Sequence, residues 1–277
     1  MVTTAARPVG RPSRLTPAIR AALFDWIKLR ADLRLVEMKD LIEEKFEVTV
    51  SERAVRRALA SMNLTRKVAR RIAQQRDPDL RDQYLHRISK YKSWQLIFVD
   101  ESGCDKAMGN RRHGWALRGF TPVLVSQFAR GKRWNILPAY WQGGVLKRWV
   151  YRGSIDTFVF DSFIEQLLQH CKPYPEPKSV LVMDNASIHF SPRMMQMCKD
   201  AGVRVEALSP YSPNFSPIEE NFHDVKKFIR KRWYRNREFV RRDFKTFLEW
   251  CVDVGSEAKT AEAHFRHAKI YVEPVPT

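Results

Sequence analysis

Two short apolar segments each end in an aspartate, and this pattern constrains the fold more than any other feature. The segments are LIFVDES (residues 96–102) and SVLVMDN (residues 179–185). Short apolar runs of this kind are typical of strands buried on both faces of a sheet. In open α/β sheets, functional residues lie beyond the carboxyl ends of the strands. Asp100 and Asp184 are therefore candidates for a single site.

The rest of the second half alternates between strand and helix patterns, which predicts a mixed α/β domain. We expect further strands at HGWALRG (113–119), RWNILPAYW (133–141) and VRVEAL (203–208). Amphipathic helices are expected over 156–170 and from 192 to a stop at Gly202.

The first half predicts three short helices. Thr16 and Pro17 form an N-cap and first-turn pair for a helix to about Arg30, and a second helix runs over about 36–46. The third begins near TVSERAV, where Thr49 and Glu52 have capping-box spacing. Its early positions off the apolar face are basic: Arg53, Arg56 and Arg57. This favours a helix-turn-helix with its third helix in the major groove, and a generic three-helix bundle is the alternative.

The charge of the chain points to a polyanionic partner. Lys and Arg total 49 against 31 Asp and Glu, a net charge of +18, which favours nucleic acid. After the third helix, LTRKVARRIAQQR (64–76) supplies candidate phosphate contacts: Arg66, Lys67, Arg70 and Arg71. Near the start, RPVGRP offers Arg11 to the minor groove, unless the segment is a plain linker. No apolar run is long enough to span a membrane, so no membrane partner is expected.

A proline-rich loop, SPYSPNFSPIEENF (209–222), leads into a basic helix. Pro217 suits the first helical position, and Glu219 then falls in the first turn. Ser216 and Glu219 have capping-box spacing, so Glu219 either caps the helix or joins the two aspartates as a third metal ligand. Hard divalent cations prefer carboxylate oxygen, and a pair of Mg²⁺ ions can clamp a phosphoryl displacement.

The helix after Glu219 is basic, with four candidate phosphate contacts: Lys226, Lys227, Arg230 and Lys231. The alternative is a solvated basic helix. The same segment is consistent with a nuclear import signal.

FVDESG, RRHGWALRG, DNASIH and SPYSPNFSPIEENF, in this order, resemble the catalytic domain of the mariner-type (Tc/mariner superfamily) DDE transposases. The 34 residues between Asp184 and Glu219 are typical of that family. The resemblance implies an RNase H-like fold with Asp100, Asp184 and Glu219 as catalytic, metal-binding residues. Three neighbouring acids compete on proximity alone: Glu101, Asp105 and Glu220.

Other residues match family positions with supporting roles. Asn185 and His189 stand beside the second acid and are expected to support it or to contact DNA, with simple structural roles as the alternative. Trp115 matches the family hairpin, as do Gly114 and Gly119, and a structural role is expected for all three.

We therefore expect an α/β protein with an RNase H-like mixed sheet and flanking helices, preceded by a small all-α helix-turn-helix domain. The expected boundaries are a Gly-Arg-Pro linker at 1–15, helix-turn-helix at 16–76, a connector at 77–93 and the catalytic domain at 94–277.

The resemblance implies a DNA transposase that uses two Mg²⁺ (or Mn²⁺) ions for phosphodiester cleavage and strand transfer. Its partners would be double-stranded transposon ends and target DNA, with a homodimer in the DNA complex. We expect location in the nucleus in a eukaryote, and otherwise in the cytoplasm with the chromosomal DNA.

Two alternatives remain at this point. Family members commonly carry two helix-turn-helix subdomains joined by a Gly-Arg-Pro linker, whereas here Gly-Arg-Pro stands at residues 10–12 and a single subdomain is expected. A domesticated or truncated DNA-binding protein with an inactive RNase H-like domain is therefore the main alternative. A nuclease acting on RNA–DNA hybrids is the other.

Overall fold

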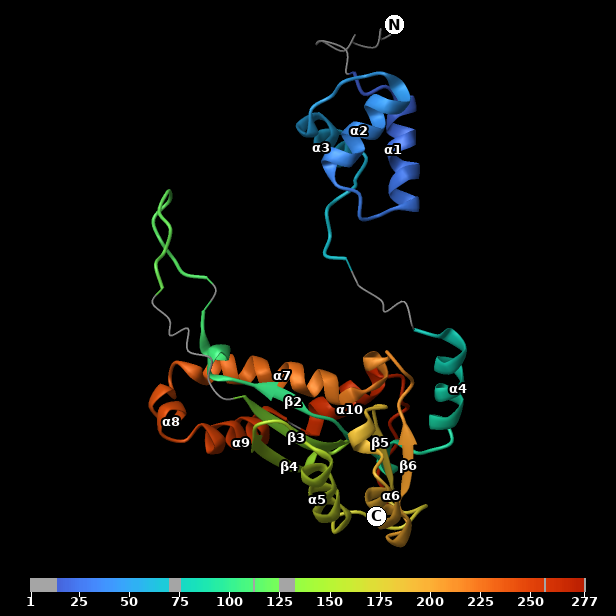
Figure 1. Ribbon diagram of the computed structural model, residues 1–277, viewed down its shortest axis with the longest axis vertical. Coiled ribbons are helices and arrows are strands. Elements are labelled where there is room, and N and C mark those ends of the chain that lie inside the picture. Colours follow the sequence, from blue (N-terminus) through green and yellow to red (C-terminus); the bar gives the residue numbers. More distant parts are fainter. Residues whose placement is uncertain (1–13, 70–75, 112, 125–132, 257, 277) are drawn as a thin grey trace, which may run out of the picture. The chain divides into compact units, whose positions relative to one another are not determined.

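The structure is a computed structural model that describes residues 14–69, 76–111, 113–124, 133–256 and 258–276 (Figure 1). The chain divides into two compact units, residues 1–72 and residues 73–277. Each unit has its own buried core and is described separately.

The first unit contains the three predicted helices: α1 (Pro17–Leu29), α2 (Leu35–Phe46) and α3 (Glu52–Ser61). Thr16 caps α1 as expected, because its hydroxyl accepts a hydrogen bond from the N–H of Ile19 at 3.4 Å. Each helix turns an apolar stripe inward, so that Leu23, Ile42 and Val55 are fully buried.

The expected N-cap of α3 was wrong by two positions. Ser51 caps the helix, accepting a hydrogen bond from the N–H of Ala54 at 3.3 Å, whereas Thr49 donates its hydroxyl to Glu43 at 3.0 Å. Ser and Thr are both good N-caps, so the sequence offered two candidates, and α3 begins directly after Ser51.

The second unit is built on a mixed six-stranded sheet. Its strands are β1 (Leu96–Val99), β2 (Ser102–Cys104), β3 (Trp134–Trp141), β4 (Gly144–Arg152), β5 (Val180–Met183) and β6 (Arg204–Ala207). Their order is β2-β3-β1-β5-β6, with β4 also paired to β3. The β1, β5 and β6 strands are parallel, while β3 runs antiparallel to β1, β2 and β4.

Strands β1 and β2 pair with β3 in one continuous register. Phe98 lies opposite Tyr140 on one side of the gap, and Ser102 lies opposite Ile136 on the other. By continuation of that register, Asp100 faces Pro138, which has no N–H to contribute to a ladder. The pairing therefore lapses at the acidic pair Asp100–Glu101, and β2 resumes beyond it.

Seven helices of the described residues belong to this unit, along with short 3₁₀ turns. They are α4 (Pro78–Ile88), α5 (Thr157–Leu168), α6 (Pro192–Asp200), α7 (Pro217–Trp233), α8 (Arg237–Arg242), α9 (Phe244–Gly255) and α10 (Ala258–His267). The turns are η1 (Ser93–Gln95), η2 (Lys106–Gly109), η3 (Ser187–His189) and η4 (Pro213–Phe215). The predicted helices over 156–170 and from residue 192 correspond to α5 and α6.

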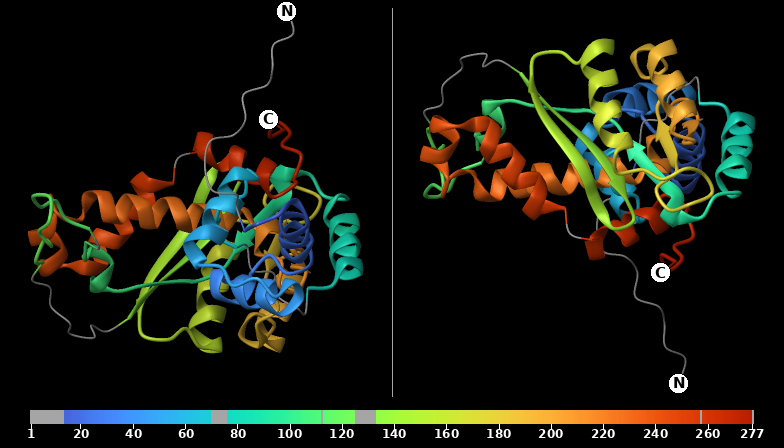
Figure 2. Two further views of the ribbon diagram at one scale, coloured as in Figure 1. Left: turned by 90° about the horizontal axis from the view of Figure 1, so that it is seen from above. Right: turned by 90° about the horizontal axis from the view of Figure 1, so that it is seen from below.

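Helices cover both faces of the sheet (Figure 2). Side chains alternate along each strand, so Phe98 packs with α7 and α10 while its neighbours Ile97 and Val99 pack with α5 and α6. On the face covered by α7, the second half of that helix packs with α8 and α9, and Phe247 and Cys251 of α9 are buried there. This double coverage explains why β1 and β5 are apolar at every position.

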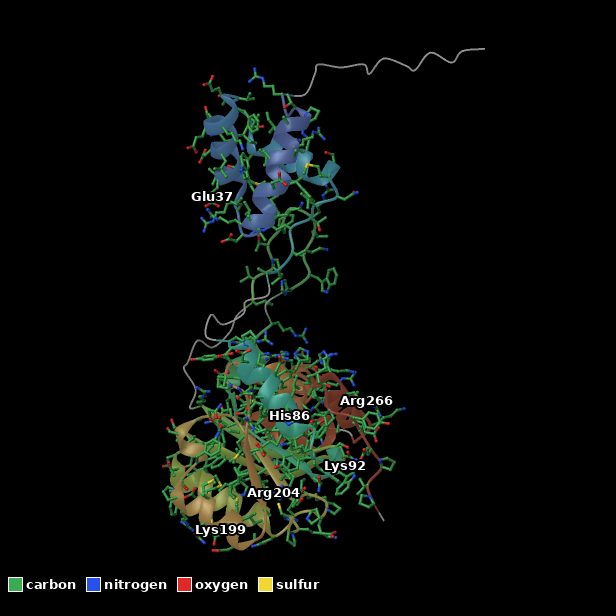
Figure 3. The ribbon with its side chains drawn as sticks, turned by 90° about the vertical axis from the view of Figure 1, so that its right-hand side faces the viewer. Glu37, His86, Lys92, Lys199, Arg204 and Arg266 are labelled. Atoms are coloured by element: carbon green, nitrogen blue, oxygen red, sulfur yellow. The ribbon has the colours of Figure 1, made fainter. Side chains whose placement is uncertain are left out.

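Helix α4 lies within the segment interpreted as a connector, but it packs on the second unit beside β6 (Figure 3). Tyr84 and Ile88 are buried in the same cluster as Phe98. Arg87 pairs with Glu206 of β6 at 3.3 Å, and Tyr91 donates its hydroxyl to the same carboxylate at 2.8 Å. The sequence analysis missed this because Tyr84 packs against Phe215, which lies far along the chain and is marked by no local pattern.

The predicted strand at 113–119 was wrong. Described residues of this segment form no strand and belong to an extended arm that leaves the body of the unit (Figure 1). The arm turns at Leu117–Phe120, where the N–H of Phe120 donates to the Leu117 carbonyl at 3.0 Å and Gly119 has φ 92°. Trp115 and Leu117 are exposed, so neither side chain packs into a core.

No helix among the described residues has the length and apolar character needed to cross a membrane.

Phe163 and Phe158 of α5 provide a matched test of the packing under the sheet. Phe163 is fully buried and packs edge-on against Trp149 with ring centroids 5.7 Å apart, whereas Phe158 is exposed. Phe163→Ala should lower the free energy of unfolding by about 3–5 kcal/mol. The Phe158→Ala control should change it by less than about 0.5 kcal/mol. Urea denaturation measures both; equal effects would contradict this packing.

Candidate active site

The parallel pairing of β1 with β5 brings the two strand-end aspartates to one edge of the sheet. Leu96 pairs with Val180 and Phe98 with Val182, so both strands end at the same level. Asp100 and Asp184 follow directly and line a cleft of about 520 Å³. Glu219, from the first turn of α7, lines the same cleft. The structure therefore brings together the three acids singled out in the sequence.

The alternation of β1 separates Asp100 from its neighbour Glu101. Asp100 follows the Phe98 side of the strand, which is the face covered by α7. Glu101 falls on the opposite side, where its carboxylate lies 3.2 Å from Nε2 of His189. Glu101 lies in the gap between β1 and β2, and its N–H donates to the Asp100 carboxylate at 2.7 Å. Proximity alone left these two acids equivalent, and the strand geometry distinguishes them.

The proline loop starts from a fixed point beside Asp184. Asn185 donates its side-chain amide to the carbonyl of Leu208 at 2.7 Å, and the N–H of Leu208 donates to the Met183 carbonyl at 2.7 Å. These bonds fasten the start of the loop to the end of β5. Asn185 therefore has a structural contact here.

Two arginines hold the middle of the loop. Arg81 of α4 donates to Ser212 at 2.6 Å and to Asn214 at 3.3 Å, and its guanidinium lies 3.9 Å from the ring centroid of Phe215. Arg76 also donates to Asn214, at 2.8 Å. The loop that leads to Glu219 is thus attached to the first helix of the unit.

The capping box expected at α7 does not form. Ser216 occupies the N-cap position, but its side chain makes no cap hydrogen bond. The N–H of Glu219 donates to the backbone carbonyl of Ser216 at 3.3 Å, and the Glu219 side chain lines the cleft. The two interpretations left open by the sequence are thereby separated in favour of a carboxylate directed at the cleft.

His189 connects two of the acidic positions. Its ring is buried against Phe160 of α5, with ring centroids 4.4 Å apart. Nδ1 lies 2.7 Å from Oδ1 of Asp184, and Nε2 lies 3.2 Å from Oε2 of Glu101. Burial alone would lower the pKa of His189, but the two carboxylates outweigh it and raise the pKa to about 9. His189 is therefore protonated at neutral pH, and its positive charge lies between the carboxylates of Asp184 and Glu101.

The acids of the cleft have opposite pKa shifts. Burial raises the pKa of Asp100 to about 7, and the charges of nearby carboxylates, including Glu219 and Asp184, act in the same direction. Burial also raises the pKa of Glu219, against an opposing effect of Lys226. Asp184 differs, because its contact with His189 lowers its pKa. The cleft thus holds two carboxyl groups that ionise less readily than usual, Asp100 and Glu219, and one that ionises more readily, Asp184.

This donor set fits a divalent cation by its chemistry. Carboxylate oxygens are the preferred ligands of Mg²⁺ and Mn²⁺, and a cation would offset both the burial and the carboxylate charges that raise the pKa of Asp100. Among the described residues, however, no three His, Cys, Asp or Glu side chains are already spaced as ligands of one ion. Oδ1 of Asp184 lies 2.7 Å from Nδ1 of His189 as an ion pair, and it accepts the N–H of Ala186 at 3.0 Å.

The candidate DNA contacts lie on several surfaces. Arg53, Arg56 and Arg57 are exposed on α3, and Arg66 and Lys67 are exposed after it. On α7, Lys227, Arg230 and Lys231 are exposed and Lys226 is half-buried. Arg11, Arg70 and Arg71 lie outside the described residues.

The sequence analysis did not predict the salt bridge between Glu101 and His189 or the hydrogen bonds from Arg81 to the proline loop. The salt bridge could have been suspected from two features: His189 follows Asp184 by five residues, and Glu101 is adjacent to Asp100. The hydrogen bonds from Arg81 join residues more than 130 positions apart, and no local pattern marks them.

A family model described as DDE superfamily endonuclease matches residues 95–241, and one described as winged helix-turn helix matches residues 32–87. No curated protein sequence matches the chain.

Solved structures of a mariner transposase, Mos1, are similar in fold. The Mos1 paired-end complex with Mg has a TM-score of 0.68 at 14% identity, covering 97% of this chain and 79% of that one. The Mos1 complex with the left transposon end and its strand transfer complex each have a TM-score of 0.63 at 16% identity, with coverage of 97% and 83%. The predicted fold class, an RNase H-like mixed sheet after a helix-turn-helix unit, is confirmed.

The link between His189 and Asp184 should make stability depend on pH. The pKa of His189 is raised from 6.5 to about 9 in the folded protein, so its contribution is complete below pH 6.5 and is lost as pH rises through about 9. The pH-dependent difference in unfolding free energy between wild type and His189→Gln should be at most about 3 kcal/mol.

Urea denaturation without added metal, repeated from pH 6 to pH 10, measures this difference. His170→Gln, a change of an exposed histidine at the end of the same layer, is the matched control. A stability gap between wild type and His189→Gln that stays constant across this range would rule out the charged contact.

Proposed function

This chain belongs to the DDE superfamily endonucleases, and from that we propose that it is a DNA transposase. It cleaves phosphodiester bonds at the ends of a mobile element and joins the freed 3′-hydroxyl to target DNA. One observation carries the proposal: Asp100, Asp184 and Glu219 reach a single cleft from three separate elements of the fold. The similarity to Mos1 in fold supports it.

Asp100, Asp184 and Glu219 are proposed as the catalytic residues and as the ligands of two Mg²⁺ or Mn²⁺ ions. When bound, such ions activate the attacking oxygen and stabilise the leaving oxygen of an in-line displacement. Mos1, which is similar in fold, has been solved in complexes with Mg and with Mn, and this supports the choice of these metals for the present chain. In this chain, His189 holds the Asp184 carboxylate in orientation from the protein side, and Asn185 secures the loop that carries Glu219.

The proposed partner is double-stranded DNA, both transposon ends and target. Arg53, Arg56 and Arg57 stand at the start of α3, where a helix-turn-helix presents its recognition helix to the major groove. Mos1 is described in complex with a transposon end, which supports the same class of partner here. A homodimer in the DNA complex, and location in the nucleus of a eukaryote, are extensions of the proposal that follow from the resemblance to mariner-type transposases.

Metal-dependent nicking of supercoiled plasmid tests the catalytic assignment. Asp184→Asn removes one carboxylate charge and should lower the nicking rate in Mg²⁺ or Mn²⁺ by at least about 100-fold. Asp200→Asn, an exposed aspartate on α6, is the matched control and should nick at the wild-type rate. Unchanged nicking in Asp184→Asn would refute the assignment. Wild-type protein that nicks neither plasmid nor end-containing DNA would favour an inactive DNA-binding protein.

Salt dependence tests the role of α3. Replacing Arg53, Arg56 and Arg57 by alanine should weaken binding to duplex DNA and reduce the slope of log K against log salt by about 0.9 for each phosphate that is no longer neutralised. Lys39→Ala on α2 controls for removal of a positive charge elsewhere in the same unit. Fluorescence anisotropy over a salt series measures both, and an unchanged slope in the triple variant would place the DNA-binding surface elsewhere.

A further inference from the structure

A second cleft lies in the same unit, at the opposite end of α7 from Glu219. It has a volume of about 630 Å³ and is formed where the end of α7 meets η2 and the base of the extended arm (Figure 1). Its walls carry aromatic and basic side chains: Arg111, His113, Arg230, Trp233 and Tyr234. None of the described residues that line it carries a carboxylate side chain.

The floor of this cleft is rigid and its rim is accessible. Trp233 packs against the rings of Phe244 and Phe247, with centroids 5.7 and 5.9 Å apart. Gly109 lies so close to the indole that a Cβ at that position would overlap it. Tyr234 at the rim is 63% exposed. The Tyr234 ring therefore stands at the mouth of a preformed cleft.

Guanidinium groups flank the Tyr234 ring. Arg111 lies 5.3 Å from its centroid and Arg237 lies 5.6 Å from it. Aromatic rings and guanidinium planes are the surfaces on which unpaired nucleobases stack, and arginine also binds the adjoining phosphates. An acidic peptide would use the arginines but would leave the aromatic rings without a partner of matching shape.

One face of α7 connects the two clefts. Glu219, Lys226, Arg230 and Trp233 are spaced by seven, four and three residues, which places them along one side of a helix. Lys226 is close enough to lower the pKa of Glu219. At 1.5 Å per residue, Trp233 is about 21 Å along the helix from Glu219, which equals the axial length of about six base pairs of duplex DNA.

We propose that the cleft lined by residues 107–111, 113, 230, 233 and 234 is a binding site for an unpaired nucleotide of DNA. The base stacks on Tyr234 at the mouth above Trp233, and Arg111 and Arg230 hold its flanking phosphates. A strand that reaches the carboxylate cleft continues along the basic face of α7 to this second contact. The inference rests on the proposed function, since it assigns a further site to the same DNA substrate.

The test measures binding of a short fluorescein-labelled single strand by anisotropy in EDTA, so that metal and cleavage play no part. The comparison strand has the same phosphates but carries abasic residues in place of nucleotides with bases. Stacking of one base on an aromatic ring should make the wild-type protein prefer the strand with bases by about 5- to 150-fold. Tyr234→Ala should lose most of this preference, and Tyr234→Phe should keep it.

Tyr271→Ala is the matched control, because Tyr271 is also exposed but lies after α10, outside this cleft. Tyr234→Ala with the wild-type preference for bases would overturn the proposed nucleotide site. Wild-type protein that binds both strands equally would also overturn it, while leaving the proposed DNA substrate intact. Wild-type protein that binds neither strand nor duplex would instead refute the DNA partner on which the inference rests.

Discussion

The parallel pairing of β1 with β5 is the constraint on which the rest of the second unit depends. Two strands that run in the same direction and end at the same level must place whatever follows them side by side. Here aspartates follow both, so folding concentrates negative charge at one edge of the sheet. Burial of Asp100 raises its pKa, and the charges of the neighbouring carboxylates add to that shift, while His189 pairs with Asp184 and Glu101. The carboxylate cleft is thus a direct result of strand order.

Much of this arrangement could be predicted from the sequence, because it depends on local patterns. The apolar runs of β1 and β5, the cap at Thr16 and the proline before α7 are short-range signals with a physical cause, and each marked its element correctly. The position of Glu219 at the first turn of α7 followed from the proline alone. The same patterns placed Asp100 and Asp184 together, whereas the family resemblance added Glu219 as the third acid.

What could not be predicted depends on contacts between distant parts of the chain. The segment at 113–119 has the alternation of a strand, yet pairing also requires a neighbouring strand, and the described structure provides none there. The role of α4 was missed because Tyr84 gains its burial from Phe215, far along the sequence. A structural reason to prefer Asp100 over Glu101 needed the face of β1 that α7 covers, which is set by contacts between distant parts of the chain.

The bonds from Arg76 and Arg81 to the proline loop have a mechanical consequence. Among the described residues of the second unit, Arg76 and Arg81 come at the start of the chain, and their side chains bond to Ser212 and Asn214. A pull on the chain ahead of Arg76 would therefore act on the loop that leads to Glu219, whereas Asp100 and Asp184 directly follow strands of the sheet.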